Sequence, residues 1–174
     1  MLTELRSQRA RFVQSDLGHD GVLSERQQFC NFLRASRLEP LGHGREVVFG
    51  GYTWTIRSGR GGPGPNAWEP ENVWLDAATN LHLKIAHREG KWSCAEVTMQ
   101  QRLGFGRYQF QTIGRIDRLD DNVVLGLFNC PTRDVGPDAT HEIDIEFARW
   151  GEARNPLGNF TVWPVEREIG RAHV

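Results

Sequence analysis

The stretch that decides the fold is Glu142-Ile143-Asp144-Ile145-Glu146-Phe147, in which acidic and apolar residues alternate strictly. Successive side chains of a β-strand point to opposite faces of a sheet. The stretch therefore predicts a strand with three carboxylates on one face and three apolar side chains on the other. The apolar face belongs in a core between two sheets, so we expect both isoleucines to be buried.

Alternation of the same period recurs along the chain from Arg45 onward. Glycine-rich and aspartate-rich turns separate the alternating segments. Many short strands at regular spacing are typical of an antiparallel sandwich or barrel. The predicted fold class is all-β, an antiparallel β-sandwich, with further strands at roughly 52–56, 72–75, 81–86, 93–101, 107–114, 122–128 and 159–163.

The first 44 residues follow a different pattern. A capping-box sequence begins at Ser24, and apolar residues then recur at helical spacing within residues 29–33. We expect a short helix at roughly 25–36, preceded by frayed helix or disorder. The predicted organisation is a helical or disordered appendage over residues 1–44 and a β-sandwich domain over residues 45–174.

The composition excludes several classes of partner. The chain has 174 residues, with 21 basic and 22 acidic side chains and a net charge of −1. This balance gives no electrostatic case for binding nucleic acid or an anionic membrane. No apolar run approaches the roughly 18 residues of a membrane-spanning helix. The N-terminus lacks the apolar segment of a secretory signal.

Cysteine and histidine residues give no pattern typical of a metal site. Cys30, Cys94 and Cys130 are too widely spaced for a zinc motif, and free thiols are favoured over a single disulfide. His82 and His141 have no partner at metal-ligand spacing, so we expect both to be surface histidines.

The acidic face of the deciding stretch indicates a chemical role, because like charges repel and strands disfavour acidic residues. Glycoside hydrolysis needs two carboxylates, about 5–5.5 Å apart for retention and about 6.5–9.5 Å apart for inversion of configuration. Glu142 and Glu146 can bring their carboxyls to roughly 6 Å by leaning toward each other. Asp144 lies between them and can split their pKa values. The alternative interpretation is a solvated acidic face or a cation site.

The run from Glu142 to Glu146 resembles the signature of glycoside hydrolase family 16, which contains endo-β-glucanases on a concanavalin-like jelly roll. Other segments match in the same order, and the resemblance covers about residues 45–165. They are Asn72-Val73-Trp74-Leu75-Asp76 with Asn80-Leu81-His82-Leu83, Cys94-Ala95-Glu96 with Phe105-Gly106-Arg107-Tyr108, and Arg149-Trp150-Gly151. The resemblance implies a concanavalin-like jelly roll.

The resemblance implies that Glu142 is the nucleophile, Glu146 the general acid and then base, and Asp144 the auxiliary carboxylate. No residue is inserted before Glu146, which is typical of the unbulged branch. The implied activity is a retaining endo-hydrolase of a β-linked polysaccharide, first a β-glucan, with algal galactans and xyloglucan-type transfer left open. A non-catalytic carbohydrate-binding module and an inactive fragment are the alternatives.

The resemblance also implies sugar contacts outside the carboxylates. Trp163 would stack on a sugar ring, as aromatic side chains do in ligand sites. A salt-bridged framework role for Glu96 and core packing for Trp150 remain open. The candidates are Glu96, Trp150, Asn159, Trp163, Asn66 and Trp68.

No organic cofactor is implied, and a structural calcium ion is allowed without assignable ligands. The expected partner is the polysaccharide substrate, and the expected state is a monomer. Family members mostly act outside the cell, so the expected location is extracellular or periplasmic. The family's domain continues well beyond the position of Val174, so we expect a sandwich that is incomplete at its C-terminus.

Overall fold

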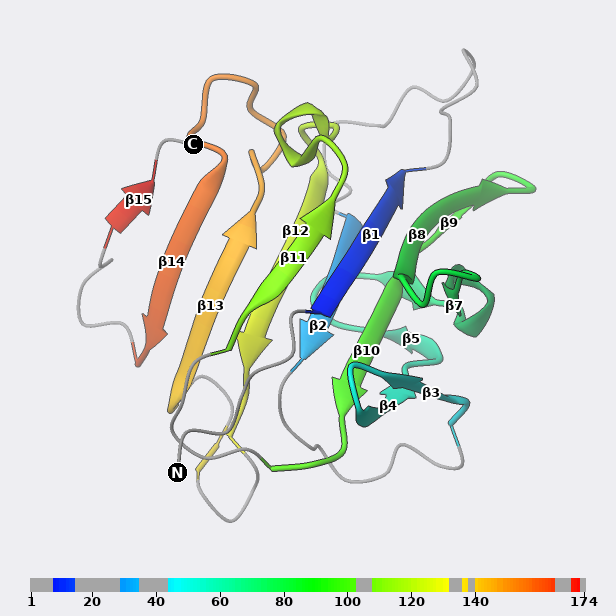
Figure 1. Ribbon diagram of the computed structural model, residues 1–174. Helices are drawn as coiled ribbons and strands as arrows, with labels where there is room; N and C mark the ends of the chain where they lie inside the picture. The colour runs from blue at the N-terminus through cyan, green and yellow to red at the C-terminus, as the bar shows by residue number, and fades with distance from the viewer. Residues whose placement is uncertain are drawn as a thin grey trace.

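The described part of the protein is mostly β-strand with almost no helix, which confirms the predicted all-β class (Figure 1). Its helical segments are two short 3-10 turns, Pro70–Asn72 and Ile116–Arg118. None of its helices has the length and apolar character needed to cross a bilayer. The computed structural model describes residues 8–14, 29–34, 44–102, 108–131, 136–137, 140–164 and 170–172.

The larger sheet has eight strands in the order β15-β14-β13-β12-β2-β10-β4-β3. The deciding stretch is β13, and its bounds are those predicted. β13 pairs antiparallel with β12 and β14, so hydrogen bonds on both edges fix its register. The strands are β2 (Phe29–Arg34), β3 (Glu46–Phe49), β4 (Tyr52–Ile56), β10 (Ala95–Met99), β12 (Val123–Asn129), β13 (Glu142–Phe147), β14 (Gly158–Trp163) and β15 (Gly170–Ala172).

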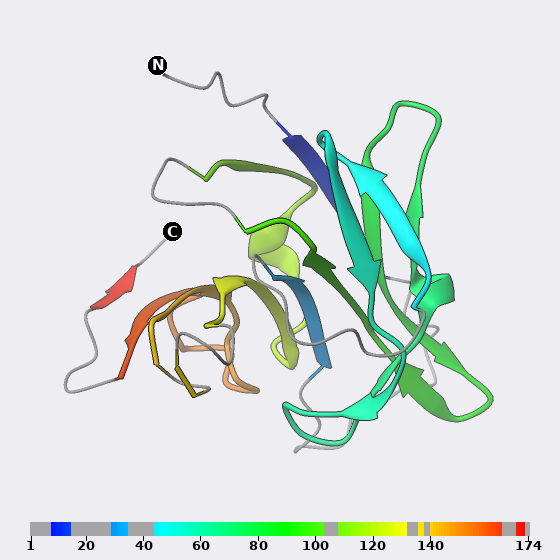
Figure 2. The same ribbon diagram turned by 90° about the horizontal axis from the view of Figure 1, so that it is seen from below.

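The smaller sheet has the order β11-β1-β8-β7, with β9 paired to β8. It lies against one face of the larger sheet, while β14 and β15 reach beyond its edge strand β11 (Figures 1 and 2). A separate hairpin is formed by β5 (Gly59–Gly61) and β6 (Asn66–Trp68). The strands of the smaller sheet are β1 (Gln8–Gln14), β7 (Val73–Leu75), β8 (Leu81–Arg88), β9 (Lys91–Ser93) and β11 (Phe110–Ile113).

The main core lies between the two sheets. Leu81 and Leu83 of the smaller sheet pack in one cluster with Trp54 and Val97 of the larger sheet, and all four are fully buried. The Trp54 indole N–H donates to the Phe49 carbonyl at 3.0 Å, so its polar atom is satisfied. Each large apolar side chain buried in this way stabilises the fold by roughly 1.5–3 kcal/mol.

The predicted helix at roughly 25–36 is wrong over residues 29–34, which form β2. This strand lies between β10 and β12 and pairs in parallel with both. Helical spacing of a few apolar residues is a weak preference, and pairing on two edges of a sheet outweighs it. The other residues of the predicted helix lie outside the described part of the chain.

β1 is inserted into the smaller sheet in the same way, between β8 and β11 and parallel to both. The remaining pairs of described strands are antiparallel. Residues 8–14 and 29–34 of the predicted appendage therefore contribute a strand to each sheet.

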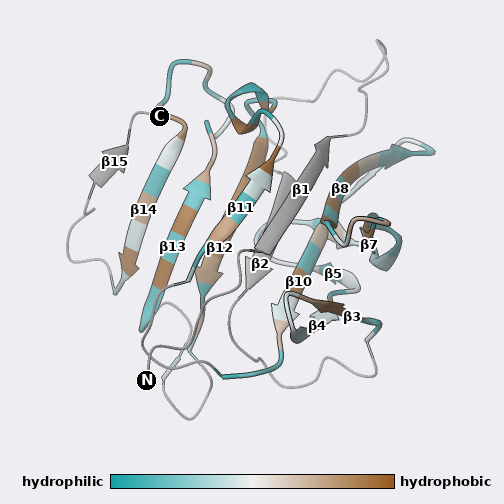
Figure 3. Ribbon diagram, viewed as in Figure 1, coloured by the Kyte–Doolittle hydropathy of each residue, from teal (hydrophilic) through white to brown (hydrophobic). Residues whose placement is uncertain are grey.

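The expectation that Ile143 is buried is wrong. Polar and apolar residues alternate along β13 and β14 as predicted (Figure 3). However, Ile143 is 53% exposed, and its partner Val162 on β14 is 41% exposed. Phe160, opposite the half-buried Ile145, is 40% exposed. The physical reason is that β14 lies outside β11, the edge strand of the described smaller sheet. The described strands of the smaller sheet therefore do not cover the apolar face of β14.

Candidate functional site

Three carboxylates lie on the outer face of β13, opposite the core. Ile145 is in register with Leu127, which packs against the core between the sheets. Because side chains alternate along a strand, Glu142, Asp144 and Glu146 point away from that core. All three are half-buried rather than fully solvated. This face is therefore a partly enclosed acidic surface.

The antiparallel strand β14 places polar and aromatic residues beside the carboxylates. Its three outward-facing residues are each in register with one acidic residue of β13. The pairs are Glu142 with Trp163, Asp144 with Thr161, and Glu146 with Asn159. The predicted grouping of Asn159 and Trp163 with the carboxylates on one face is therefore confirmed.

Burial and like charge control the protonation of Glu146. Desolvation raises its pKa, and the neighbouring charges of Asp144 and then Glu142 raise it further, to about 7. On β12, its register partner is Gly126, which adds no side chain beside it. A carboxyl with a pKa near 7 holds a proton that it can donate at neutral pH.

Asp144 is held by two hydrogen bonds. The Trp163 indole N–H donates to Oδ2 of Asp144 at 2.7 Å, and the side chain of Glu142 makes the second bond. Burial raises the pKa of Asp144, and both hydrogen bonds oppose that rise. Two carboxyl groups can hydrogen bond only when they share a proton. Asp144 and Glu142 are therefore placed so that the two carboxyl groups can share a proton.

Glu96 is in register with Glu146 across the larger sheet, but it already forms an ion pair with Arg57. The register connects the two residues across β10, β2, β12 and β13. Glu96 is only 2% exposed, and Nη1 of Arg57 donates to its Oε2 at 2.6 Å. Of the two roles left open for Glu96, this geometry favours the framework role.

Arg57 was not among the predicted site residues. The alternation of β4 could have identified it, because Arg57 follows the polar residues of β4 at the same two-residue period and lies next to Glu96. Its guanidinium also lies over the ring of Trp68, 4.4 Å from the ring centroid. Arg57 therefore joins β4, β10 and the β5–β6 hairpin.

Asn66 and Trp68, two predicted sugar contacts, are buried and bonded within the protein. The Trp68 indole N–H donates to the Gly61 carbonyl at 3.1 Å, and the Asn66 amide donates to the Pro63 carbonyl. These bonds fix the hairpin and its tip. In this conformation neither side chain is exposed to a ligand, so their assignment as sugar contacts is corrected to a structural role.

Three predicted sugar contacts remain near the carboxylates or accessible to solvent. Nδ2 of Asn159 is buried and has no hydrogen-bond partner among the described residues, so it is a donor beside Glu146. Trp150 is 37% exposed, in a left-handed turn (φ 56°) shortly after β13. Trp163 differs from the prediction, because its polar edge already binds Asp144.

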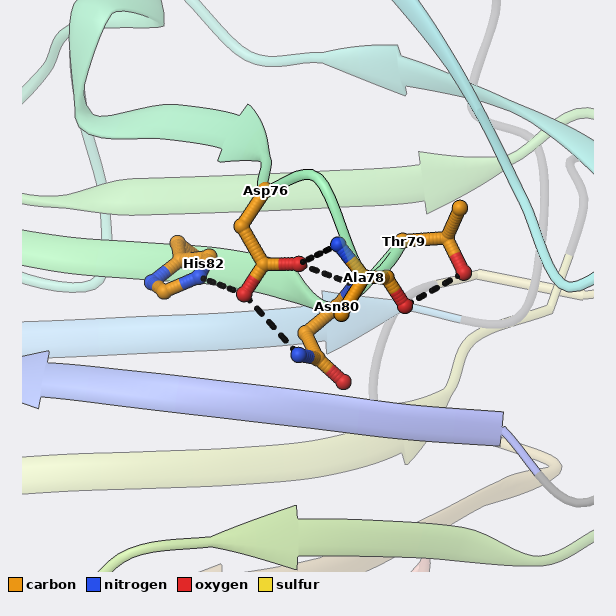
Figure 4. Close-up of polar contacts among 5 residues, drawn as sticks. All are labelled: Asp76, Ala78, Thr79, Asn80 and His82. Atoms are coloured by element: carbon orange, nitrogen blue, oxygen red, sulfur yellow. Dashed lines mark hydrogen bonds and ion pairs between the residues drawn. The ribbon is translucent and has the colours of Figure 1, made fainter.

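The prediction that His82 is a surface residue is wrong, whereas His141 is exposed as predicted. His82 is 6% exposed, stacks on Trp74 at 4.6 Å, and places Nε2 2.9 Å from Oδ2 of Asp76. Asp76 also accepts bonds from the backbone of the following turn and from Asn80 (Figure 4). The hydrogen bond with His82 is the main reason that the pKa of Asp76 lies well below its usual range.

The Asp76–His82 contact has a structural explanation. It joins the end of β7 to the start of β8 and fixes the connecting turn. The described residues contain no group of three or more histidine, cysteine, aspartate or glutamate side chains arranged to hold a metal ion.

Comparison with known proteins gives no match to a family model, to a curated protein or to a solved structure. Function must therefore be inferred from β13 and from the strands that lie beside it.

Proposed function

We propose that this chain is a retaining endo-glycoside hydrolase that acts on a β-linked polysaccharide, with a β-glucan as the first candidate. In this proposal the two sheets belong to a concanavalin-like jelly roll. The observation that carries the proposal is that the carboxyl groups on one face of β13 differ in their protonation and hydrogen bonding. Burial and the charges of Asp144 and Glu142 raise the pKa of Glu146 to about 7, and Asp144 and Glu142 are hydrogen-bonded to each other on the same strand face.

The proposed reaction has two steps. First, with the proton of the pair on Asp144, the Glu142 carboxylate attacks the anomeric carbon while Glu146 donates its proton to the departing glycosidic oxygen. This step forms a glycosyl-enzyme ester and releases one sugar product. Glu146 then removes a proton from water, which attacks the anomeric carbon and releases Glu142 as a carboxylate. This sequence needs one acid and one nucleophile on the same face.

The half-burial of the acidic face supports catalysis over a solvated surface. Burying carboxylates beside one another costs free energy, and a fold gains no stability from it. The Trp163 indole and the unpartnered Nδ2 of Asn159 add hydrogen-bond donors on the same face. Donors beside a carboxylate pair are suited to holding sugar hydroxyl groups.

The test compares variants on a soluble β-glucan and on an aryl β-glycoside. Glu142→Gln should abolish turnover of both substrates. Glu146→Ala should lose about 10²–10⁴-fold on the polysaccharide but much less on the aryl glycoside, because a good leaving group needs little protonation. Glu152→Gln, an exposed change in the turn after β13, is the matched control.

Two results would contradict the proposal. Wild-type activity in Glu142→Gln would exclude Glu142 as the nucleophile. Binding of β-glucan by the wild-type chain with no cleavage would favour the non-catalytic carbohydrate-binding alternative.

A further inference from the structure

The contact between Trp163 and Asp144 gives Trp163 a role that stacking on a sugar does not explain. Trp163 is on β14, in register with Glu142, yet its indole N–H reaches diagonally to Oδ2 of Asp144 at 2.7 Å. A 2.7 Å bond to a carboxyl oxygen is at the short end of the N–H···O range. The edge of the indole is thus fixed by the carboxylate site itself.

The two strands that pair with β13 place no charged side chain beside Asp144, so the hydrogen bond from the Trp163 indole has a large effect on this carboxyl. β12 (Val123–Asn129) and β14 (Gly158–Trp163) contain no charged residue. The charged residues near Asp144 on these three strands are therefore the two glutamates of β13, Glu142 and Glu146. The next strands outward carry Arg34 on β2, in register with Phe128, and Arg171 on β15, in register with Asn159. Beside the hydrogen bond with Glu142, the Trp163 N–H donates directly to Asp144.

We infer that Trp163 is a positioning residue, which holds one oxygen of Asp144 and thereby presents the other oxygen to Glu142. A carboxyl rotates freely about its terminal bond unless one oxygen is held. With Oδ2 engaged by the indole, Asp144 keeps its remaining capacity for the proton shared with Glu142. Its catalytic meaning rests on the proposed hydrolase function, but the positioning itself does not.

Two variants separate the indole N–H from the indole ring. Trp163→Phe keeps an aromatic ring and removes the donor. Trp163→Gln removes the ring and keeps an N–H the same number of bonds from Cα as the indole nitrogen. Trp92→Phe is the matched control, because Trp92 stacks on His87 in the β8–β9 hairpin.

The first readout is the carboxyl ¹³C titration of the Asp144–Glu142 pair, which reports apparent pKa values of the pair. Trp163→Phe should raise the apparent midpoint by about one pH unit, since a bond to the anion is lost. Trp163→Gln should recover most of that change. Asp117, an exposed residue paired with Arg115, and the Trp92→Phe protein should titrate as in the wild type.

The second readout needs no substitution at the site. The indole ¹H–¹⁵N resonance of Trp163 in the wild-type protein should shift over the same pH range as the pair. A resonance that does not move there would overturn the inference, even if a variant failed to fold. An unchanged pair titration in a folded Trp163→Phe protein would overturn it as well.

Activity on soluble β-glucan separates this inference from the proposed function. Positioning predicts about a tenfold loss of kcat in Trp163→Phe with KM nearly unchanged, and partial recovery in Trp163→Gln. A stacking role predicts the reverse, with KM raised in Trp163→Gln and near normal in Trp163→Phe. If the wild type cleaves no glucan but the titrations behave as expected, the hydrolase proposal fails and the positioning of Asp144 stands.

Discussion

At the scale of single residues, Glu146 shows how a functional group acts against stability. Its carboxyl is desolvated on β13 and faces two other carboxyls, which raise its pKa from 4.5 to about 7. A raised carboxyl pKa means that the folded state binds the proton more tightly than the unfolded chain does. The contribution of Glu146 is therefore most favourable below pH 4.5 and is lost as the pH rises toward 7.

Replacing Glu146 by glutamine should remove the destabilisation of the folded state that the ionised Glu146 carboxylate causes at high pH. Above pH 7, Glu146→Gln should be more stable than the wild type by on the order of 2–3 kcal/mol, and the difference should shrink below pH 5. Urea unfolding at pH 5 and pH 8 measures it. A constant difference at the two pH values would contradict the raised pKa.

The same protonation sets the expected pH dependence of turnover. The proposed acid form of Glu146 is half populated near pH 7. We expect kcat on a polysaccharide to fall about tenfold per pH unit well above pH 7. In Glu146→Ala this alkaline limb should disappear, as a pH profile on the aryl glycoside would reveal.

At the scale of elements, the two faces of β13 have different surroundings. The outer face holds the carboxylates, and the inner face carries Ile143, which is more than half exposed. The alternation of the sequence was sufficient to predict the strand, its bounds and the grouping of the acidic residues. The alternation could not predict whether another layer packs over Ile143, because that depends on where the smaller sheet ends.

Other errors have the same origin in tertiary contacts. His82 alternates outward on β8, but stacking on Trp74 and the bond to Asp76 bury it. Trp68 was predicted as a sugar contact, whereas it is buried beneath the Arg57 guanidinium and its indole N–H donates to the Gly61 carbonyl. A local pattern indicates which face a side chain occupies, and only its neighbours decide whether that face is open.

The exposed apolar face of β13 and β14 should contribute little to stability. Val162→Thr should change the free energy of unfolding by less than about 0.5 kcal/mol, whereas Leu83→Ala in the core should cost about 2–5 kcal/mol. Thermal or urea unfolding distinguishes the two variants. Val162→Thr should also lower the binding of a hydrophobic dye, and a large destabilisation would show that this face is covered in solution.

At the scale of the whole molecule, the two N-terminal strands hold the sheets together. β2 separates β10 from β12, so the larger sheet divides into two halves without it. β1 likewise separates β8 from β11 in the smaller sheet. Local sequence patterns could not predict this arrangement, because the pairing partners of both strands lie far along the chain.

Deleting residues 1–43 should therefore abolish the native structure rather than trim an appendage. We expect loss of cooperative thermal unfolding and of the near-ultraviolet circular dichroism of the buried tryptophans, of which Trp54 is in the main core. A truncated chain that still unfolds cooperatively at the wild-type temperature would show that β1 and β2 are dispensable.

The parallel insertion of β1 and β2 also sets the order of events on the ribosome. Their partners β8, β10, β11 and β12 lie further along the chain and are synthesised after them. Pairing between distant segments is slow, and unpaired strand edges are prone to aggregate. Until these partners have been synthesised, β1 and β2 lack the neighbours that they have in the two sheets, and a chaperone that covers unpaired strands would protect the chain during this interval.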